Sequence, residues 1–198
     1  VTMVEKSYPE LRDNLSTARS PHMMQGSVIK TYLAEKLGRK PSDIILTSIM
    51  PCTAKKHEAR RHEFYKDDVP DVDFVLTTRE LGKLLRLKKV PLGSLKPIPY
   101  DPLMGISTGA GALFGATGGV MEAAARTAYE YSTGKKLAKM EFSDLRGLKG
   151  IKEFSVELLT ADKKPVNVKL AVCNGVANAR FLIEKMKSGE AKYDFIEV

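Results

Sequence analysis

The chain has 198 residues, and its 32 Lys and Arg against 24 Asp and Glu give a formal net charge of +8. Hydrophobic residues make up 43% of the sequence and only two Cys are present, which excludes a low-complexity tail, a collagen-like repeat and a disulfide scaffold. A chain of this length buries roughly 70% of its unfolded surface, enough for a real core. No apolar run approaches the roughly 18 residues of a membrane span, no secretory signal opens the sequence, and two distant Cys fit a reducing compartment.

The positive charge is distributed along the chain in short clusters, such as Lys55-Lys56 and Lys88-Lys89. Most of these residues are expected on solvated helix faces and in loops, but the excess charge also favours an acidic partner. Nucleic acid is not favoured, because the chain has no Trp and its Phe residues do not interleave with the basic clusters as a stacking surface requires. A small acidic electron-carrier protein matches the charge equally well.

The first half of the sequence predicts a helix, two strands and a second helix. Ser20 is a good N-cap and Pro21 a good first helical residue, while Gly38 and Pro41 end the apolar helical pattern. Two β-branched, apolar runs predict a buried strand and a shorter one, and Thr78 can cap the helix that follows. In chain order these elements are Pro21–Leu37, Asp43–Met50, Asp73–Thr77 and Thr78–Leu87.

The second half begins with a connector that contains four Pro between positions 91 and 102, a density that excludes regular structure. A glycine-rich run and then a long helix that ends at Gly134 follow it. Further on the pattern predicts two strands joined by a polar turn, a helix capped by Asn174, and a last strand, namely Phe154–Leu159, Val166–Val172, 175–187 and Tyr193–Val198. The order of elements is that of an α/β protein, and neither an internal repeat nor a linker between domains is evident.

The glycine-rich run GISTGAGALFGATGG (105–119) allows two interpretations. It misses the dinucleotide fingerprint because Phe114 stands where Gly is needed, and it contains no phosphate-loop Lys. One interpretation is a tight loop that packs on its own core. The other is a loop whose backbone lies close to a ligand, anionic in view of the helix N-terminus that follows.

The segment Met50-Pro51-Cys52-Thr53-Ala54-Lys55-Lys56 places a thiol where the first strand ends, the edge at which α/β proteins bind ligands. An ammonium three residues later favours a thiolate, either as nucleophile or as metal ligand, whereas an inert half-buried Cys is the alternative. Zinc is not expected, because His57 and His62 are five residues apart and do not share a helix face.

Here the sequence resembles a known family. The run MPCTAKK after the strand TSI resembles the second cysteine motif of the iron-only (FeFe) hydrogenases, and four longer stretches agree with the same family in the same order. They are NLSTARSPHMMQG, DVDFVLTTREL, STGAGALFGATGGVMEAAARTAYE and AVCNGVANARFLIEKMKSGEAKYDFIE, so the resemblance covers essentially the whole chain. It implies an α/β fold with mixed, mostly parallel sheets flanked by helices, here the central part of the hydrogenase catalytic domain.

The resemblance also implies a cofactor and a reaction. Family members bind a six-iron centre, the H-cluster, in which a 4Fe-4S cubane held by four Cys is bridged to a two-iron unit with CO, cyanide and azadithiolate ligands. They reduce protons to hydrogen reversibly. Cys52 matches a cubane ligand, Lys55 matches a residue that donates a hydrogen bond to a cyanide, and Ser16 matches a proton-relay serine. Glu58 matches an acid beside the lysine; residues matching the lining of the two-iron pocket are Met50, Pro21, His22 and Phe114.

Departures from the family pattern are also informative. His22 stands where the family usually has Gln, and it can titrate near neutral pH. Cys173 falls where the family needs no thiolate and is expected to be a structural core residue. The first motif, T-S-C-C-P-G-W, is expected just before Val1 and the third, M-A-C-P-G-G-C, just after Val198. Residues 1–198 are therefore expected to be one catalytic-domain fragment, truncated at both ends, that holds one of the four cubane ligands and is inactive alone.

Three functions remain open at this point. The first is a ferredoxin-dependent hydrogenase that acts on protons and H2, needs maturation proteins for its two-iron unit, and lies in a bacterial cytoplasm or an algal chloroplast stroma. The second is a non-hydrogenase relative that acts in iron–sulfur protein assembly and lacks the two-iron unit. The third is a sensory hydrogenase with poor turnover. The SPH segment, Lys55 and the GATGGVMEA run favour the first over the second.

Overall fold

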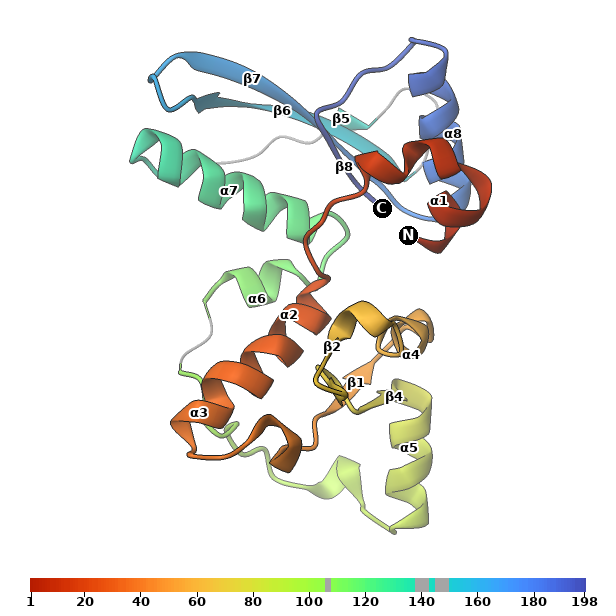
Figure 1. The fold of residues 1–198 in the computed structure, drawn as a ribbon, viewed down its shortest axis with the longest axis vertical. Coiled ribbons are helices and arrows are strands. Elements are labelled where there is room, and N and C mark those ends of the chain that lie inside the picture. The colour runs from red at the N-terminus through yellow and green to blue at the C-terminus, as the bar shows by residue number, and fades with distance from the viewer. Residues whose placement is uncertain (106–107, 138–142, 145–149) are drawn as a thin grey trace. The chain divides into compact units, whose positions relative to one another are not determined.

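The computed structural model describes residues 1–105, 108–137, 143–144 and 150–198. The chain divides into two compact units, 1–105 and 106–198, and the boundary follows the Pro-rich connector. Each unit combines helices with a small sheet, as Figure 1 shows, so the predicted α/β class is confirmed. Among the described helices none is both long and apolar enough to cross a membrane.

The first unit opens with α1 (Thr2–Ser7) and the 3-10 turn η1 (Pro9–Asn14), and then forms the predicted long helix. That helix consists of α2 (Pro21–Val28), the π-helical stretch η2 (Ile29–Leu33) and α3 (Ala34–Lys36). Ser20 caps it, because its Oγ accepts a hydrogen bond from the backbone N–H of Met23 at 3.4 Å. Both predicted ends of the helix are therefore confirmed.

Strands β1 (Thr47–Met50) and β4 (Phe74–Thr77) form a two-stranded parallel sheet in which Ser48 pairs with Val75. The prediction of a buried strand from position 43 was wrong in length and in burial. Pro41–Asp43 form a 3-10 turn, η3, and the backbone N–H of Leu46 donates to the Asp73 carboxylate at 2.7 Å rather than to a strand. The exposed face of the strand carries Ile49, which is 49% exposed.

A buried ammonium holds the long helix against this sheet. The side chain of Lys30 is only 5% exposed, and its Nζ lies 2.8 Å from an Oδ2 of Asp73 and also donates to the backbone carbonyl of Ile44. Gly26 lies on the same side of the helix, where an added Cβ would stand 2.7 Å from the carbonyl oxygen of Asp71. The helix can approach residues 71–73 this closely only because position 26 has no side chain.

Short elements complete the first unit. Thr77 and Glu80 form a capping box at the start of α5, so the cap is Thr77 rather than the expected Thr78. The Pro-rich connector was predicted to have no regular structure, and it differs from this in one short 3-10 turn, η5. In chain order these elements are α4 (Ala54–Glu58), η4 (His62–Phe64), β2 (Tyr65–Lys66), β3 (Val69–Pro70), α5 (Thr78–Leu87) and η5 (Leu92–Ser94).

The second unit is built on a mixed sheet with the order β5-β6-β7-β8. The predicted hairpin is confirmed, since β6 and β7 are antiparallel over nine residue pairs, and β8 then joins β7 in parallel. The elements are α6 (Ala110–Leu113), α7 (Gly119–Thr133), β5 (Ser143–Asp144), β6 (Ile151–Leu159), β7 (Pro165–Cys173), α8 (Val176–Lys187) and β8 (Phe195–Glu197).

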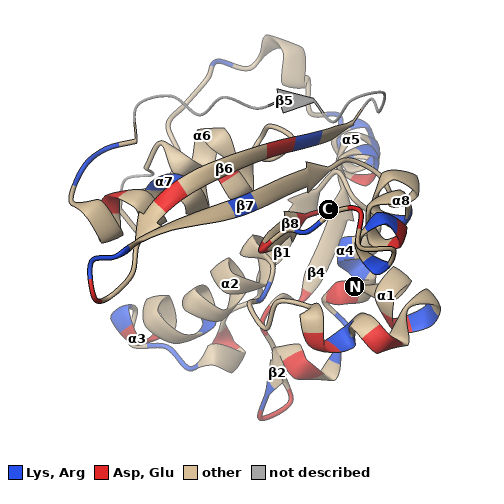
Figure 2. Cartoon of the chain, turned by 90° about the horizontal axis from the view of Figure 1, so that it is seen from above, with Lys and Arg blue, Asp and Glu red and all other residues tan. Residues whose placement is uncertain are grey.

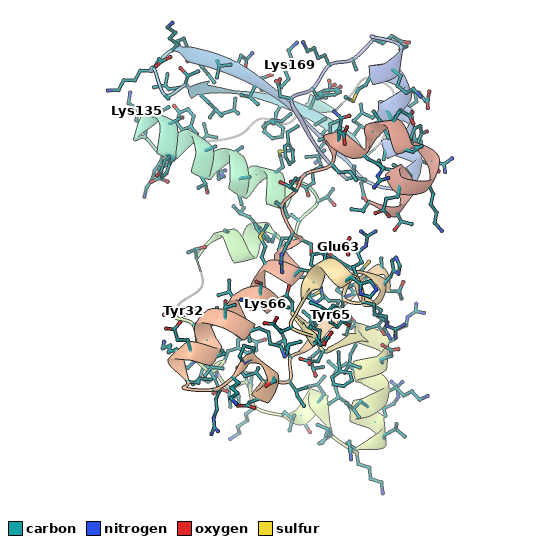
Figure 3. The ribbon with its side chains drawn as sticks, in the orientation of Figure 1. Tyr32, Glu63, Tyr65, Lys66, Lys135 and Lys169 are labelled. Carbon is teal, nitrogen blue, oxygen red and sulfur yellow. The ribbon has the colours of Figure 1, made fainter. Side chains whose placement is uncertain are left out.

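Alternation along the hairpin separates its two faces. Helix α7 lies along one face (Figure 1), where Met121, Phe154 and Leu170 belong to one buried apolar cluster. Lys169 projects from β7 on the face away from α7 (Figure 3). Helix α8 begins at Val176, one residue later than predicted, because Gly175, at φ +92°, takes the N-cap position instead of Asn174.

Candidate functional site

Cys52 lies in the short loop between β1 and α4. The strand ends at Met50, Pro51 cannot continue a ladder, and α4 begins at Ala54. The thiol is free and exposed, whereas Cys173 is buried with 1% of its surface exposed. The sequence therefore places one accessible sulfur at the carboxyl end of a parallel strand, three residues before Lys55.

Lys55 and Glu58 form an ion pair on α4. The Lys55 Nζ lies 2.6 Å from a Glu58 Oε2, and the two side chains are 26% and 22% exposed. Burial acts to raise the pKa of the Glu58 carboxyl, but hydrogen bonds from Lys55 and Ser20 outweigh it and hold the pKa below the usual 4.5. Glu58 is therefore an ionised acceptor with two donors.

Ser20 connects this pair to the long helix. Its hydroxyl oxygen accepts from the N–H of Met23 as the helix cap and bonds through its side chain to Glu58. The segment Ser20-Pro21-His22, which turns into α2, is thereby held at α4. Two segments that the sequence analysis singled out separately, SPH and the Cys-Lys loop, meet through this contact.

His22 points into the interior of the first unit. It is 8% exposed, and its Nε2 lies 2.8 Å from the Ser48 Oγ on β1. Its Nδ1 is buried and has no hydrogen-bond partner among the residues that the structure describes. Burial and then the charge of Lys55 lower the pKa of His22 below the usual 6.5, and Glu58 opposes them. The ring is therefore held in its neutral form around neutral pH.

The other predicted site residues occupy different surroundings. Pro21 is exposed at the first position of α2, and Met50 is half-buried at the end of β1. Ser16 is exposed, and its Oγ accepts from the N–H of Ala18 at 3.1 Å. Phe114 ends α6 in the second unit and is 41% exposed. The assigned roles of these residues, like those of Lys55, Glu58 and Cys52, stay predictions.

The sequence analysis did not identify two hydroxyl groups of the site. Ser20 was assigned only as a helix cap, although its side chain also reaches Glu58. Ser48 was not assigned at all. Its signal is a hydroxyl residue between the apolar residues of the predicted strand DIILTSIM, which is typical of a side chain that hydrogen-bonds to a buried polar partner.

Histidines 57 and 62 take no part in these contacts. Both are exposed, and the ring centroid of His62 lies 6.5 Å from that of Tyr65. Tyr65 is labelled in Figure 3, between Glu63 and Lys66 in the segment after α4. Within the part of the chain that the structure describes, no three His, Cys, Asp or Glu side chains come together as a metal site. Cys52 is thus a single sulfur donor rather than one of a preformed cluster of ligands.

The end of the glycine-rich run packs tightly within the second unit, so the first of its two interpretations holds for Gly118 and Gly119. A Cβ at Gly119 would lie 1.6 Å from the carbonyl oxygen of Leu113, and one at Gly118 would meet Val172 at 3.1 Å. The start of α7 is also already occupied, because the N–H of Met121 donates to the Glu197 carboxylate at 2.6 Å. The anion at this helix N-terminus comes from β8 of the same chain.

The chain is thus an α/β protein whose first unit has an exposed strand-end thiol beside the half-buried Lys55–Glu58 pair and the buried His22. All of it, residues 1–198, matches the family described as "Iron only hydrogenase large subunit, C-terminal domain". The chain belongs to this family, as the resemblance predicted.

Individual relatives agree with the assignment. The chain is 45% identical over 201 residues to Iron hydrogenase 1 of Clostridium pasteurianum, and this alignment covers all of this chain and 34% of that protein. It is 33% identical to Cytosolic iron-sulfur assembly component 3 of Rattus norvegicus, with 93% of this chain and 39% of that protein covered. An apo FeFe-hydrogenase HydA1 from Chlamydomonas reinhardtii has a similar fold, with a TM-score of 0.83, 42% identity, and coverage of 98% of this chain and 55% of its own. The chain therefore spans little more than a third of these two curated relatives.

Proposed function

We propose that residues 1–198 are part of one catalytic domain of an FeFe hydrogenase that reduces protons to hydrogen reversibly. The support is the match over the whole chain, together with the contact that joins the Ser20-Pro21-His22 turn to Lys55 and Glu58 beside Cys52. We expect residues 1–198 alone to be inactive, because they supply only one sulfur ligand near the proposed site.

The cofactor expected at this site is the H-cluster, and the residues present fit it in kind. Cys52 offers an exposed thiol in the short loop after β1, a donor that iron accepts as thiolate. The buried, unpaired Nδ1 of His22 is an open polar position of the kind that a bound group or water fills. When bound, the H-cluster supplies the redox chemistry and the metal at which protons and hydrogen interconvert. The ligands other than Cys52, and the maturation proteins for the two-iron unit, are expected from outside this chain.

In this proposal the side chains hold and orient the cofactor and carry protons. Lys55 keeps its ammonium charged against Glu58 and has further N–H groups to offer a cyanide ligand. Ser16, whose hydroxyl is exposed, is proposed as a relay for protons arriving from solvent. In the first unit the proposed lining residues are Met50, Pro21 and His22, and the resemblance adds Phe114 from the second unit as a separate expectation.

The proposed electron partner is ferredoxin or a similar acidic carrier. Support comes from the net charge of +8 and from the basic residues of α4 and α5, whose positions are coloured blue in Figure 2. Turnover driven by such a carrier is expected to fall as ionic strength rises, because salt screens the attraction. Turnover that is independent of salt would contradict an electrostatic docking site. A bacterial cytoplasm or a chloroplast stroma is the proposed location.

The two Cys residues provide a matched test of the site. In the full-length protein, Cys52→Ser is expected to abolish the cubane signal in EPR and hydrogen evolution together, because a serine hydroxyl is a poor ligand for iron. Cys173→Ser is expected to keep both, since that thiol is sealed in the core of the second unit. If Cys52→Ser retained full iron content, Cys52 would not be a ligand and the proposed site would be wrong.

A second candidate is a role in iron–sulfur protein assembly, which the 33% identity to the rat assembly component supports. The higher identity to Iron hydrogenase 1 favours the hydrogenase. Infrared spectra separate the two, because only a protein with the two-iron unit shows carbonyl and cyanide stretching bands. A protein with those bands but little turnover would instead be the sensory type of hydrogenase.

A further inference from the structure

Buried polar atoms in folded proteins almost always have a hydrogen-bond partner. Among the described side chains, the Nδ1 of His22 is a buried nitrogen atom that has no hydrogen-bond partner. The residue is 92% buried by its 8% exposure, so bulk water does not serve as the partner. A ring nitrogen of this kind, at the contact between two site segments, points to something that is bound there.

Ser48 determines what this nitrogen can do. Its hydroxyl has one proton, and the Oγ lies within 3.5 Å of the carbonyl oxygen of Phe74, which can only accept. With that proton directed at the carbonyl, the Oγ is left to accept from the His22 Nε2, 2.8 Å away. The neutral ring then carries its hydrogen on Nε2 and a bare lone pair on Nδ1.

The alternative tautomer is less favourable. It would place a buried N–H on Nδ1 with no acceptor, and orphaned buried N–H groups are rarer than under-used acceptors. The doubly protonated ring is disfavoured as well, because burial and the Lys55 charge lower the pKa. The charged groups that act on the ring are Lys55 and Glu58, both on α4, while β1 presents only the neutral Ser48.

We propose that the Nδ1 of His22 is an acceptor position of the site, kept bare by Ser48, and that it takes a hydrogen bond from an O–H or N–H donor. The donor is either an ordered water or a group of the bound cofactor, and the second source rests on the proposed function. A Gln at this position, as in the family pattern, carries an amide that can donate as well as accept. With His22 in this tautomer, the Nδ1 position can accept a hydrogen bond but cannot donate one.

The first arm of the test uses the full-length protein without cofactor, labelled with 15N-histidine. The resonances of His22 are those lost in His22→Gln, and the matched control is His62→Gln, which changes an exposed ring. Long-range 1H–15N spectra around neutral pH are expected to show a protonated Nε2 and a bare Nδ1. Ser48→Ala, which keeps the ring, is expected to lose this single tautomer. A protonated Nδ1, or an unchanged tautomer in Ser48→Ala, would overturn the proposal.

The second arm identifies the donor. If it is a water, the Nδ1 resonance already shows the upfield shift of a hydrogen-bonded lone pair in the cofactor-free protein. If it is the bound group, the carbonyl and cyanide infrared bands of the loaded protein shift in His22→Gln and not in His62→Gln. Either result supports the proposal, and an unbonded Nδ1 together with unshifted bands overturns it. A loaded wild type without such bands would refute the proposed function, while the first arm would still decide the tautomer.

Discussion

The Glu58 carboxylate provides the most direct test of the site as built. We consider Glu58→Gln, which keeps the shape of the side chain and removes its charge. In the native chain Glu58 accepts from the Lys55 ammonium at 2.6 Å and bonds to Ser20. The amide retains one oxygen acceptor for these two donors and places an NH2 group where the second carboxylate oxygen was.

The expected cost follows from these contacts. A hydrogen bond to a charged group contributes about 1.5–3 kcal/mol to stability. Lys55 and Glu58 are 26% and 22% exposed, so solvent screening places each bond toward the lower end of that range. Since Gln can still accept one of the two bonds, we expect Glu58→Gln to lower the free energy of unfolding by about 1–2 kcal/mol at neutral pH.

The pH dependence distinguishes this pair from a general loss of packing. The pKa of Glu58 is lowered in the folded chain, so near that pKa the unfolded state binds more protons and stability rises with pH. The contribution is complete above the usual value of 4.5 and is lost as pH falls through the lower folded pKa. The gap between wild type and Glu58→Gln should therefore close in acid.

Urea denaturation of the 198-residue chain, followed by circular dichroism across this pH range, measures the gap. Glu35→Gln is the matched control, since Glu35 is exposed on α3 and the structure gives its side chain no ion pair within the described residues. A gap that stays constant down to acid pH, or a Glu58→Gln variant as stable as Glu35→Gln at neutral pH, would refute the reasoning.

Three further outcomes test the fold around the site. Lys30→Met should lower the free energy of unfolding, measured in urea, by about 3–5 kcal/mol, because it leaves Asp73 without its partner in a buried ion pair. Adding Asp73→Asn to this variant should recover part of the loss. In the native chain Ellman's reagent should react at once with Cys52, while Cys173, whose thiol pKa is raised by burial and by a nearby carboxylate, should react only after unfolding. Gly119→Ala should cost about 1–3 kcal/mol, since its Cβ would overlap the carbonyl of α6, whereas Gly109→Ala, with open space around it, should be neutral.

Local signals in the sequence predicted the helices and the hairpin well. The Ser20-Pro21 start of the long helix, the end of α7 at Gly134 and the β6–β7 hairpin all follow from caps and periodicity within a few residues. The strand that was expected from Asp43 differs because its first half is held by a side chain. Asp73 takes the hydrogen-bond position at Leu46 that a neighbouring strand would take, and no periodicity in residues 43–50 contains that information.

Family resemblance supplied the candidate site residues, and their contacts were not predictable from one sequence. Glu197 is far along the chain from the N-terminus of α7, yet its carboxylate accepts from that helix end, which the sequence alone had left open for an anionic ligand. Likewise nothing in the spacing of Ser20 and Glu58 indicates that they touch. Contacts between distant segments depend on how helices pack, and several packings satisfy the same local pattern.

The polarity of the site explains why Glu58 and His22 should respond to different assays. Both donors to Glu58 belong to the same chain, so replacing Glu58 changes contacts within the protein and its effect is measured as a change in stability. His22 has one nitrogen satisfied by Ser48 and the other left open, so the chain loses little at Nδ1 when the ring is replaced. What changes there is the bond to a group that the chain does not supply. The two residues are coupled through the charge on Glu58, which partly offsets the effect of Lys55 on the ring. Removing that charge should therefore lower the pKa of His22 further and keep its Nδ1 an acceptor over a wider range of pH.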